Sequence, residues 1–587
     1  MKKFKYTSYA AVVLLSASIA SCNKLDEYNP SGATSDGVWT TPQGFVTIVN
    51  GAYYEQRNWY GKEDGIFMSE AGTDLWYNRE GQSYNKQLAR YDGLNGTTGT
   101  IKNDWAAIWR AINQCNAGIG RIDQAGFTDE AEKNRRLGEL RFLRAFYYWH
   151  VVETWGNVML RTKETTDVET TASRSTIKEF YDLIVSDLEF AKDHLPDAWG
   201  NEYSRATRKS ALGLLARACL TRAYYPDADA NAWFTKARDV AKFTIENRGA
   251  LGVDLYKSAD SIWLPANNKK NKEALYIISN SSVNINGNYD ANANRDHLYY
   301  LANYSKNRVA LKRAMEYGND NGRLLQPTRY LLDLYSEGDA RYDATFQEKW
   351  YNNVDTTFKW TSSNYTTAYY KKSTTVYTNN LTIAPKELAL VLTKGTLTAT
   401  EKLEAPYLAF DRDDMYAADG KVITTTTNGI SVNGNYPGLK KFMDPNRGTN
   451  VDLQPGFNDI FVIRLAEMYL IAGEAEYKLG NAAAAATHFN DLRKRAIKPG
   501  YETAMAVDAS MINDTWILEE RARELCAEHI RWFDLKRILR GQNWVDYIKA
   551  RNPDVTLVNP FNWVRPISQD EINALLNATE FKQNDGY

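Results

Sequence analysis

Residues 517–540 carry the densest set of groups that could perform acid–base chemistry. Four carboxylates and a histidine are concentrated there: Glu519, Glu520, Glu524, Glu528 and His529. Hydrolysis of a glycosidic bond needs two carboxyl groups about 5–10 Å apart in a cleft. The same stretch has apolar residues spaced by three and four positions, which predicts one long amphipathic helix. It is therefore either a catalytic element or a helix whose charges hold a scaffold together.

Motifs for metal binding and nucleophilic catalysis are weak in the rest of the chain. The histidines are far apart and lack the spacing of zinc ligands: His150, His194, His297, His488 and His529. No Gly-x-Ser-x-Gly motif or glycine-rich phosphate loop is present. Two acidic triplets, at 227–229 and 411–413, lack the Gly at the sixth position and the Glu at the twelfth that a calcium loop needs. We expect no enzymatic activity and no cofactor, with a structural calcium left open.

Many aromatic residues are set among polar ones, which indicates exposed rings as well as core. The chain has 38 Tyr and 16 Trp. Exposed Tyr and Trp rings offer flat apolar area to a ligand, and neighbouring Asn, Asp and Arg side chains offer hydrogen bonds. The candidate ligand residues are Asp74, Trp76, Tyr77, Arg79, Tyr91, Tyr289, Asn292, Tyr299 and Tyr300. For each of them the alternative is a loop anchor or the edge of the core.

The N-terminal residues predict a lipid anchor. A basic start precedes an apolar stretch that is too short to span a bilayer. The stretch ends in the motif Ile19-Ala20-Ser21-Cys22, which is typical of a bacterial lipoprotein. Residues 1–21 are then a signal peptide, Cys22 is lipidated and residues 22–40 form a tether; the alternative is an ordinary secretory signal. Three acyl chains would anchor the protein persistently, because each buried methylene contributes roughly 0.8 kcal/mol.

The charge balance, the hydropathy and the cysteines of the chain argue against a nucleic-acid partner, a membrane-spanning segment and a metal site. Lys and Arg number 71 against 72 Asp and Glu, so nothing indicates a nucleic-acid partner. No segment after residue 21 is long and apolar enough to cross a membrane. Cys115, Cys219 and Cys526 lie in helical patterns without metal spacing. We expect them to be small buried side chains.

Helical periodicity dominates two parts of the chain, 41–260 and 458–587. Helices of the first part are predicted at 103–122, 131–153, 176–195, 206–224 and 232–245. Such consecutive helices favour antiparallel helical repeats. In the second part, four residues have the separations of a tetratricopeptide helix pair: Gly473, Gly480, Ala485 and Phe489. In that motif small residues allow two helices to approach, and the aromatic ring fills the gap between neighbours.

Residues 261–457 differ from both helical parts. They are rich in Asn, Thr, Ser and Tyr, with short predicted strands at 274–279 and 388–392. The segment is too long to be one loop of a compact body. The predicted fold is therefore mainly α, a tetratricopeptide-like helical-repeat body that carries an irregular, loop-rich lobe with short β-strands.

Several short blocks follow one another in a fixed order along the mature chain. They are Cys22 with Leu25-Asp26-Glu27, Asn50-Gly51-Ala52-Tyr53, Thr73-Asp74, the block 139–148, Asp339-Ala340-Arg341-Tyr342, the block 464–470, Glu520-Arg521-Ala522-Arg523-Glu524-Leu525, the block 531–537 and the block 583–587. Together they resemble the SusD/RagB family of outer-membrane nutrient-binding lipoproteins, and the resemblance spans most of the mature chain.

The resemblance implies a function as well as a fold. It implies a cell-surface lipoprotein that captures an oligosaccharide, less often a peptide, and delivers it to a SusC-like TonB-dependent transporter. A helical-repeat scaffold that binds only protein partners and a surface hydrolase remain alternatives. Under the resemblance, the charges of residues 517–540 form a network that locks a helix against the repeats, with Trp532 and Phe533 buried beneath it.

Overall fold

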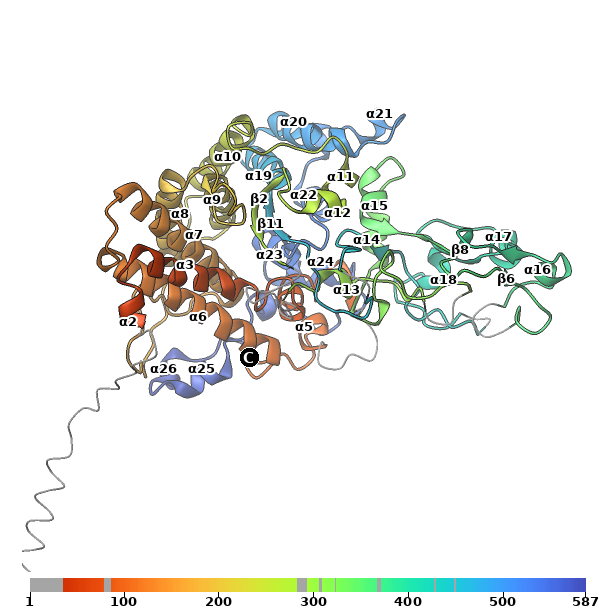
Figure 1. Ribbon diagram of the computed structural model, residues 1–587, viewed down its shortest axis with the longest axis horizontal. Coiled ribbons are helices and arrows are strands. Elements are labelled where there is room, and N and C mark those ends of the chain that lie inside the picture. Colours follow the sequence, from red (N-terminus) through yellow and green to blue (C-terminus); the bar gives the residue numbers. More distant parts are fainter. Residues whose placement is uncertain are drawn as a thin grey trace, which may run out of the picture.

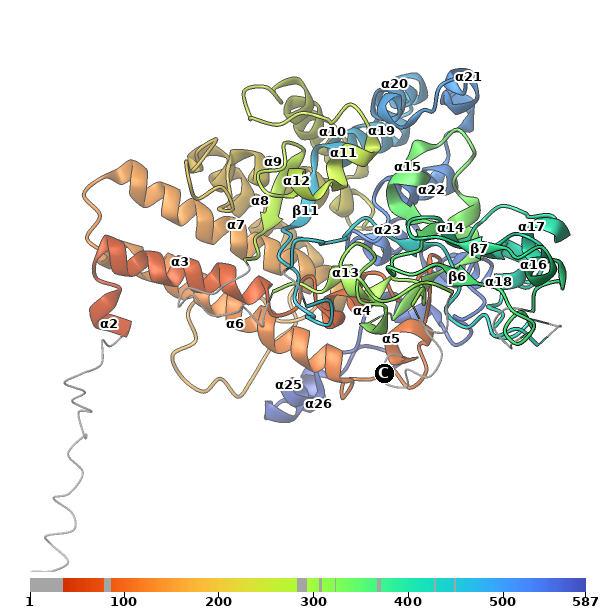
Figure 2. The same ribbon diagram turned by 45° about the vertical axis from the view of Figure 1, so that its right-hand side comes forward.

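The computed structural model describes residues 35–78, 86–281, 293–305, 309–322, 324–366, 371–426, 429–447 and 450–587. The predicted signal peptide and Cys22 lie outside these residues. A body of long helices forms one end of the molecule, and a lobe of short strands and helices projects from the other (Figures 1 and 2). The mainly α fold, with its helical body and irregular lobe, is thus confirmed.

The body is a row of helices in which each packs against the next. They are α3 (Pro42–Gln56), α6 (Gly99–Arg121), α7 (Glu130–Trp155), α8 (Ile177–His194), α9 (Arg208–Ala223), α10 (Ala230–Glu246), α19 (Leu465–Lys478) and α20 (Ala482–Arg493). The five helices predicted in the first part are all present. Because α10 packs directly against α19, the row continues past the lobe that separates these two helices in the sequence (Figure 1).

Local signals explain where these helices begin and end. The side chain of Thr41 caps α3 by accepting from the backbone N–H of Gly44, and Pro42 occupies the first turn. Thr176 and Glu179 cap α8 reciprocally. Helix α7 ends at Gly156, whose φ of 71° falls in the region that favours glycine.

The predicted tetratricopeptide pair corresponds to α19 and α20. A Cβ atom on Gly473 would lie 2.7 Å from the ring of Phe489, so only glycine permits this approach. The Phe489 ring also makes an edge contact with Trp516, at 4.8 Å between centroids. The small residue and the ring therefore have the roles that their spacing predicted.

A two-stranded sheet lies where the lobe leaves and rejoins the body. Strand β2 (Ala274–Ile278) pairs antiparallel with β11 (Ile460–Arg464). Both strands are buried and lie beside α9. The pairing brings the two connections of the lobe together, although the exact domain boundaries remain a prediction.

The lobe contains short strands and single-turn helices. Its strands are β3 (Leu325–Pro327), β4 (Phe346–Gln347), β5 (Lys349–Tyr351), β6 (Phe358–Lys359), β7 (Thr382–Ile383), β8 (Leu388–Leu392), β9 (Leu408–Phe410) and β10 (Gly438–Leu439). Its helices are α11 (Ala259–Trp263), α12 (Pro265–Asn268), α13 (Asp296–Tyr299), α14 (Arg329–Asp333), α15 (Ala340–Thr345), α16 (Thr375–Thr378), α17 (Ala399–Leu403) and α18 (Arg412–Met415). The largest sheet has the order β5-β8-β9, in which β8 pairs antiparallel with β5 and parallel with β9.

The remaining elements join the body to the lobe and close the chain. They are α2 (Ser35–Val38), α4 (Glu63–Ser69), β1 (Trp76–Asn78), α5 (Lys86–Arg90), α21 (Glu502–Met505), α22 (Asp514–Glu524), α23 (Arg531–Ile538), α24 (Gly541–Lys549), α25 (Gln569–Ala574) and α26 (Ala578–Phe581). Strand β1 pairs antiparallel with β3, so the N-terminal segment reaches the lobe.

The single long helix predicted over residues 517–540 is wrong. Helix α22 ends at Glu524, and α23 begins only at Arg531. Ala527 and His529 between them have φ angles of 63° and 60°, which interrupt any helix. Trp532 and Phe533 are buried as expected, and so is Cys526 with the other two cysteines of the described chain.

The C-terminal tail packs back against the first helices of the body. The Asn584 amide donates to the carbonyl oxygens of Trp155 at 2.9 Å and Arg565 at 2.8 Å. Arg174 donates to the carbonyl oxygen of Phe581 at 2.8 Å. The tail is therefore part of the fold of the body.

Candidate ligand-binding site

Asp74 and Trp76, two of the predicted ligand residues, belong to the core. Both side chains are fully buried. Asp74 forms a bidentate ion pair with Arg531. The indole N–H of Trp76 donates to Glu70 Oε2 at 3.0 Å. The expectation that they contact a ligand is therefore wrong, since neither side chain presents surface to solvent.

The same correction applies to Tyr91, Tyr299 and Tyr300. At most 6% of each residue is exposed. The Tyr91 hydroxyl donates to the carbonyl oxygen of Gly72, and the Tyr300 ring packs 4.6 Å from that of Trp76. These rings hold the segment after α4 against α13 and the C-terminal helices. Three further candidates, Arg79, Tyr289 and Asn292, lie outside the described residues.

Tyr77 is the predicted ligand residue that is described and partly exposed. It is the central residue of β1, between two buried neighbours. The guanidinium of Arg90 lies 6.0 Å from the centre of its ring. Arg90 in turn pairs with Asp554 at 2.6 Å, and Asp554 accepts from the backbone N–H of Asn78 at 3.0 Å. Burial raises the pKa of Asp554, and Arg90 opposes that shift.

A second aromatic group is attached to the same segment. The Arg551 guanidinium lies 3.7 Å from the ring centre of Tyr547 and 5.1 Å from that of Tyr330. The two tyrosine hydroxyls are 3.3 Å apart. Asn552 connects this group to β1, because its amide donates to the carbonyl oxygen of Trp76 at 2.9 Å.

We call these residues the Tyr77–Tyr330 surface, and it consists of Tyr77, Arg90, Tyr330, Arg551 and Asp554. The two tyrosines and the two arginines are partly exposed, whereas Asp554 is buried behind Arg90. Rings beside planar guanidinium groups can cover an apolar face and donate to hydroxyls or carboxylates at fixed angles. The arrangement therefore suits a saccharide or a peptide better than a small apolar ligand.

Sequence reasoning missed four of these five residues. Tyr330 lies just after β3, and only the pairing of β1 with β3 brings it near Tyr77. Arg551 and Asp554 belong to the C-terminal part, which the sequence had assigned to the scaffold. Tyr547 and Arg551 are four positions apart, the spacing of one helical turn, but such pairs are too common to identify a site without the fold.

Three of the four carboxylates that first suggested catalysis, Glu520, Glu524 and Glu528, are ion-paired and buried, whereas Glu519 is partly exposed and lies 3.9 Å from Arg523. Glu520 pairs with Arg493 at 2.5 Å and with Arg341 at 2.9 Å. Glu524 pairs with Arg495 at 2.6 Å. Burial alone would raise the pKa values of both carboxyl groups, but the arginines outweigh it and lower them. An acid held ionised in this way is a poor proton donor.

The network extends through Glu528 and Arg464 to the sheet at the base of the lobe. Arg464, the last residue of β11, pairs with Glu528 at 2.6 Å and with Glu273 at 2.6 Å. Lys441 of the lobe contacts Glu528 at 2.5 Å. Glu528 lies between α22 and α23, so the network holds the interruption between them against the lobe. These contacts are those of a structural network.

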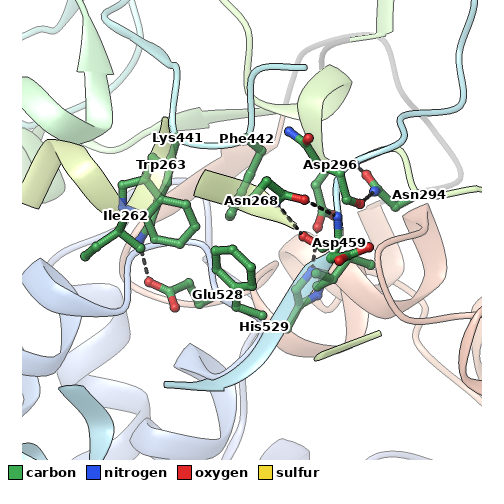
Figure 3. Close-up of a pocket in the computed structure, with 13 residues that line it drawn as sticks. Ile262, Trp263, Asn268, Asn294, Asp296, Lys441, Phe442, Asp459, Glu528 and His529 are labelled. Atoms are coloured by element: carbon green, nitrogen blue, oxygen red, sulfur yellow. Dashed lines mark hydrogen bonds and ion pairs between the residues drawn. The ribbon is translucent and has the colours of Figure 1, made fainter. Parts of the chain in front are cut away.

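His529 lies at a small cavity between the lobe and the body. The cavity has a volume of about 30 Å³, room for about one water molecule. Figure 3 shows Trp263 on one side of it and Asn294 and Asp296 on the other. His529 Nε2 lies 3.2 Å from Asp296. Burial lowers the pKa of His529, but Asp296 together with Glu70 and Glu528 outweighs burial and raises it. A sugar does not fit here.

Glu70 is a buried acid that interacts electrostatically with His529. Burial raises its pKa to about 7. Its carboxylate accepts from the Trp76 indole and, at 3.1 Å, from the backbone N–H of Ile530. Glu70 therefore fixes the start of α23 and the position of Trp76 together.

The acidic triplets considered for calcium have other roles. Asp411 and Asp229 cap α18 and α10, and Asp227 pairs with Arg222 at 2.7 Å. Over the described part of the chain, no group of three His, Cys, Asp or Glu side chains is arranged to hold a metal ion. Among the same residues, no helix combines the length and apolarity needed to cross a bilayer.

Two family profiles together cover nearly all of the described chain. The profile of the SusD family matches residues 262–587, which is more than half of the sequence. A profile described as starch-binding and associating with the outer membrane matches residues 26–220. The first match covers the lobe and the C-terminal helices, and the second covers the N-terminal helices.

Individual relatives agree with these profiles. SusD-like protein P2 of Formosa agariphila is 23% identical over 598 residues, with 100% of each chain covered. A SusD homolog from Bacteroides thetaiotaomicron superposes with a TM-score of 0.68 at 20% identity, covering 94% of this chain and 98% of its own. A laminarin-binding SusD-like protein gives a TM-score of 0.64 at 19% identity, covering 93% and 100%.

The two structures share the fold of this chain, and the profile match assigns the family independently of them. The helical row and the lobe that it carries are therefore a fold that this chain shares with those structures. The chain belongs to the SusD family.

Proposed function

We propose that this protein is a surface lipoprotein that captures oligosaccharides and delivers them to a SusC-like TonB-dependent transporter in the outer membrane. Membership of the SusD family and the match to a starch-binding, outer-membrane-associated profile support the proposal. One similar protein is itself described as laminarin-binding. The family contains binding proteins rather than enzymes, in keeping with the ion-paired carboxylates of α22.

The Tyr77–Tyr330 surface is the observation that carries the proposal. Tyr77 lies beside Arg90 and Tyr330 lies beside Arg551, and hydrogen bonds from Asn552 to Trp76 and from Asn78 to Asp554 connect both pairs to β1. Strand β1 belongs to the stretch in which the sequence predicted ligand contact. Micromolar affinity, about −8 kcal/mol, is sufficient for capture and still allows release to a transporter.

Calorimetry of the mature protein against a panel of polysaccharides tests the binding. We expect heat of binding for at least one glycan, and about tenfold weaker binding for Tyr77→Ala, because the loss of one stacked ring costs roughly 1 kcal/mol or more. Tyr351→Ala is the matched control, since Tyr351 is 43% exposed but lies on β5 of the lobe. Binding to peptides with no response to any glycan would instead make this a peptide-binding member of the family.

The lipid anchor at Cys22 has its own test. We expect the protein with Cys22 to incorporate an alkyne-labelled palmitate and to be recovered in the outer-membrane fraction. The Cys22→Ser variant should not incorporate the label. Protease added to intact cells should degrade a protein that faces outward. Labelling that persists in Cys22→Ser would contradict this site of lipidation.

Delivery to a transporter requires a stable partner in the membrane. Purification under mild detergent should recover a TonB-dependent transporter together with the lipidated protein. Recovery of the transporter without any effect of glycans would favour a scaffold that binds only proteins. Release of sugar from a bound polymer by the pure protein would favour the hydrolase alternative.

A further inference from the structure

A second pocket lies where α9 begins beside β2, away from the Tyr77–Tyr330 surface. Its volume is about 260 Å³. The walls are the loop before α9, the first turn of α9 and the segment from Lys270 to Ile277. Figure 1 shows β2 lying beside α9, and these two elements are in contact. None of the residues of the Tyr77–Tyr330 surface lines this pocket.

The pocket is lined by cations and by no carboxylate among the described residues. Its charged lining residues are Arg205, Lys209, Lys270 and Lys272. Glu273 lies next to Lys272 in the sequence but points elsewhere, because it is paired with Arg464 and Arg495. The whole chain has nearly equal numbers of acidic and basic residues, so four basic side chains around one pocket are a local excess of positive charge.

Two of these four cations are not engaged by the protein. Arg205 pairs with Glu139 at 3.0 Å, and the Lys272 ammonium lies 4.7 Å from the Tyr256 ring centre. Lys209 and Lys270, in contrast, make no side-chain hydrogen bond or ion pair with any residue that the structure describes. Burial lowers the pKa of Lys209, and no carboxylate offsets that effect. An anion that entered the pocket would supply the missing counter-charge.

The surrounding groups suit a hydroxylated anion. Helix α9 has 16 residues and begins at Arg208, so the positive end of its dipole adds to the lysine charges at this wall. Ser204 contributes a partly exposed hydroxyl to the lining, whereas the side chains of Thr207 and Asn271 are buried and hydrogen-bonded within the protein. The volume lies near the lower end of the roughly 300–1,000 Å³ of small-molecule pockets. It therefore accommodates one sugar unit or the charged end of a longer chain.

We propose that this pocket binds the carboxylate or sulfate group of an acidic saccharide, with Lys209 and Lys270 as the contacting cations. The proposal goes beyond capture at the Tyr77–Tyr330 surface, because it gives the protein a second subsite and a preference for charge. A saccharide long enough to reach both sites would bind more tightly than either part alone.

Calorimetry of the mature protein with trigalacturonic acid and with maltotriose tests the proposal. We expect the acidic trisaccharide to bind and its affinity to fall as NaCl is raised, since salt screens exposed charges. Lys209→Gln and Lys270→Gln should each weaken it about tenfold, the loss expected for one charge-assisted hydrogen bond. Lys349→Gln, an exposed lysine of β5, is the matched control and should leave binding unchanged.

The opposite outcomes are equally specific. Unchanged binding in both lysine variants, or no binding of trigalacturonic acid by the unmodified protein, would overturn the inference. If inorganic sulfate binds as tightly as the trisaccharide, the pocket recognises only an anion and not a saccharide, and the inference is also overturned. Tyr77→Ala should leave this binding intact; its loss there would place the acidic sugar on the Tyr77–Tyr330 surface instead. The two proposals can therefore fail separately.

Discussion

Arg531 and Asp74, which are 457 positions apart in the chain, form a buried bidentate ion pair with N–O distances of 2.8 and 2.5 Å. The pair joins the segment that leads into β1 to the first turn of α23. Both side chains are buried. Asp74 was predicted to contact a ligand because it lies in a polar, aromatic segment. It instead links the N-terminal part of the chain to the C-terminal part through Arg531.

Asp74→Ala should destabilise the protein strongly and leave the Tyr77–Tyr330 surface chemically unchanged. Removal of one partner leaves the Arg531 charge buried without compensation, which costs about 3–5 kcal/mol. Urea unfolding followed by circular dichroism measures the loss. Asp74→Ala combined with Arg531→Met should recover part of the stability, and no recovery would mean that the pair does not act as a unit.

Trp76→Ala and Tyr77→Ala should have opposite effects, although the residues are adjacent. Trp76 is fully buried, so its truncation should cost about 3–5 kcal/mol of stability. Tyr77 is partly exposed, so its truncation should lower glycan affinity and change stability by less than about 1 kcal/mol. Melting curves and calorimetry on both variants separate the two effects. A stable Trp76→Ala protein with lost binding would reverse this assignment.

Stability should fall in acid through Glu524. Burial raises its pKa, but Arg495, Arg464 and Arg341 outweigh burial and hold the pKa at about 2, against an ordinary value of 4.5. Between these values the unfolded chain binds more protons than the native state, so stability rises with pH. The ionised Glu524 carboxylate therefore makes its full contribution to the free energy of unfolding above about pH 4.5. This contribution, on the order of 3 kcal/mol, is lost as the pH falls toward about 2.

Glu524→Gln provides the control for this acid dependence. The variant cannot lose a carboxylate charge, so its free energy of unfolding should change less between pH 6 and pH 3 than that of the unmodified protein. It should also be less stable at neutral pH, because the arginines then lack one counter-charge. Equal pH dependence in the two proteins would show that other acids dominate.

Gly473→Ala should weaken the contact between α19 and α20. Its Cβ atom would lie 2.7 Å from the Phe489 ring, and overpacking of this kind costs about 1–3 kcal/mol. Phe489→Leu on the same background should restore part of the loss by removing the clashing ring atoms. Thermal unfolding of the two variants measures this coupling, and strictly additive losses would argue against a direct clash.

The helical body could be predicted because its signals are local. Thr41 with Pro42, Thr176 with Glu179, and the spacing of Gly473 and Phe489 each act within one or two neighbouring helices. Strand β8 was predicted with its bounds at 388–392 for the same reason, since a short apolar run between polar segments is a local pattern.

The interruption at 525–530 could not be predicted from such signals. It contains neither Gly nor Pro, and Ala527 and His529 adopt positive φ without a local cause. Partners from distant segments stabilise it: Glu528 is held by Arg464 and Lys441, and the Ile530 N–H is held by Glu70. Tertiary contacts therefore override the helix propensity of this stretch.

The candidate site was only partly predictable for a related reason. Trp76 and Tyr91 stand among Asp, Asn and Gly, which suggested an exposed loop. The polar neighbours of Trp76, Asp74 and Asn78, are themselves buried, and Asp74 pairs with Arg531. Tyr77 is partly exposed, as a ligand residue has to be, and its contact with a ligand stays a prediction. Tyr330 and Arg551 could be connected with it only through the pairing of β1 with β3 and the hydrogen bond from Asn552 to Trp76.

The return of the C-terminal tail to the body has a consequence for how the chain folds. The carbonyl oxygen of Trp155, at the end of α7, receives the amide of Asn584, and Arg174 reaches the carbonyl oxygen of Phe581. A nascent chain cannot make these bonds until its final residues have been synthesised. Such non-local contacts slow folding and leave incomplete intermediates prone to aggregation. The N-terminal helices therefore lack these contacts until residues 581–584 have been synthesised.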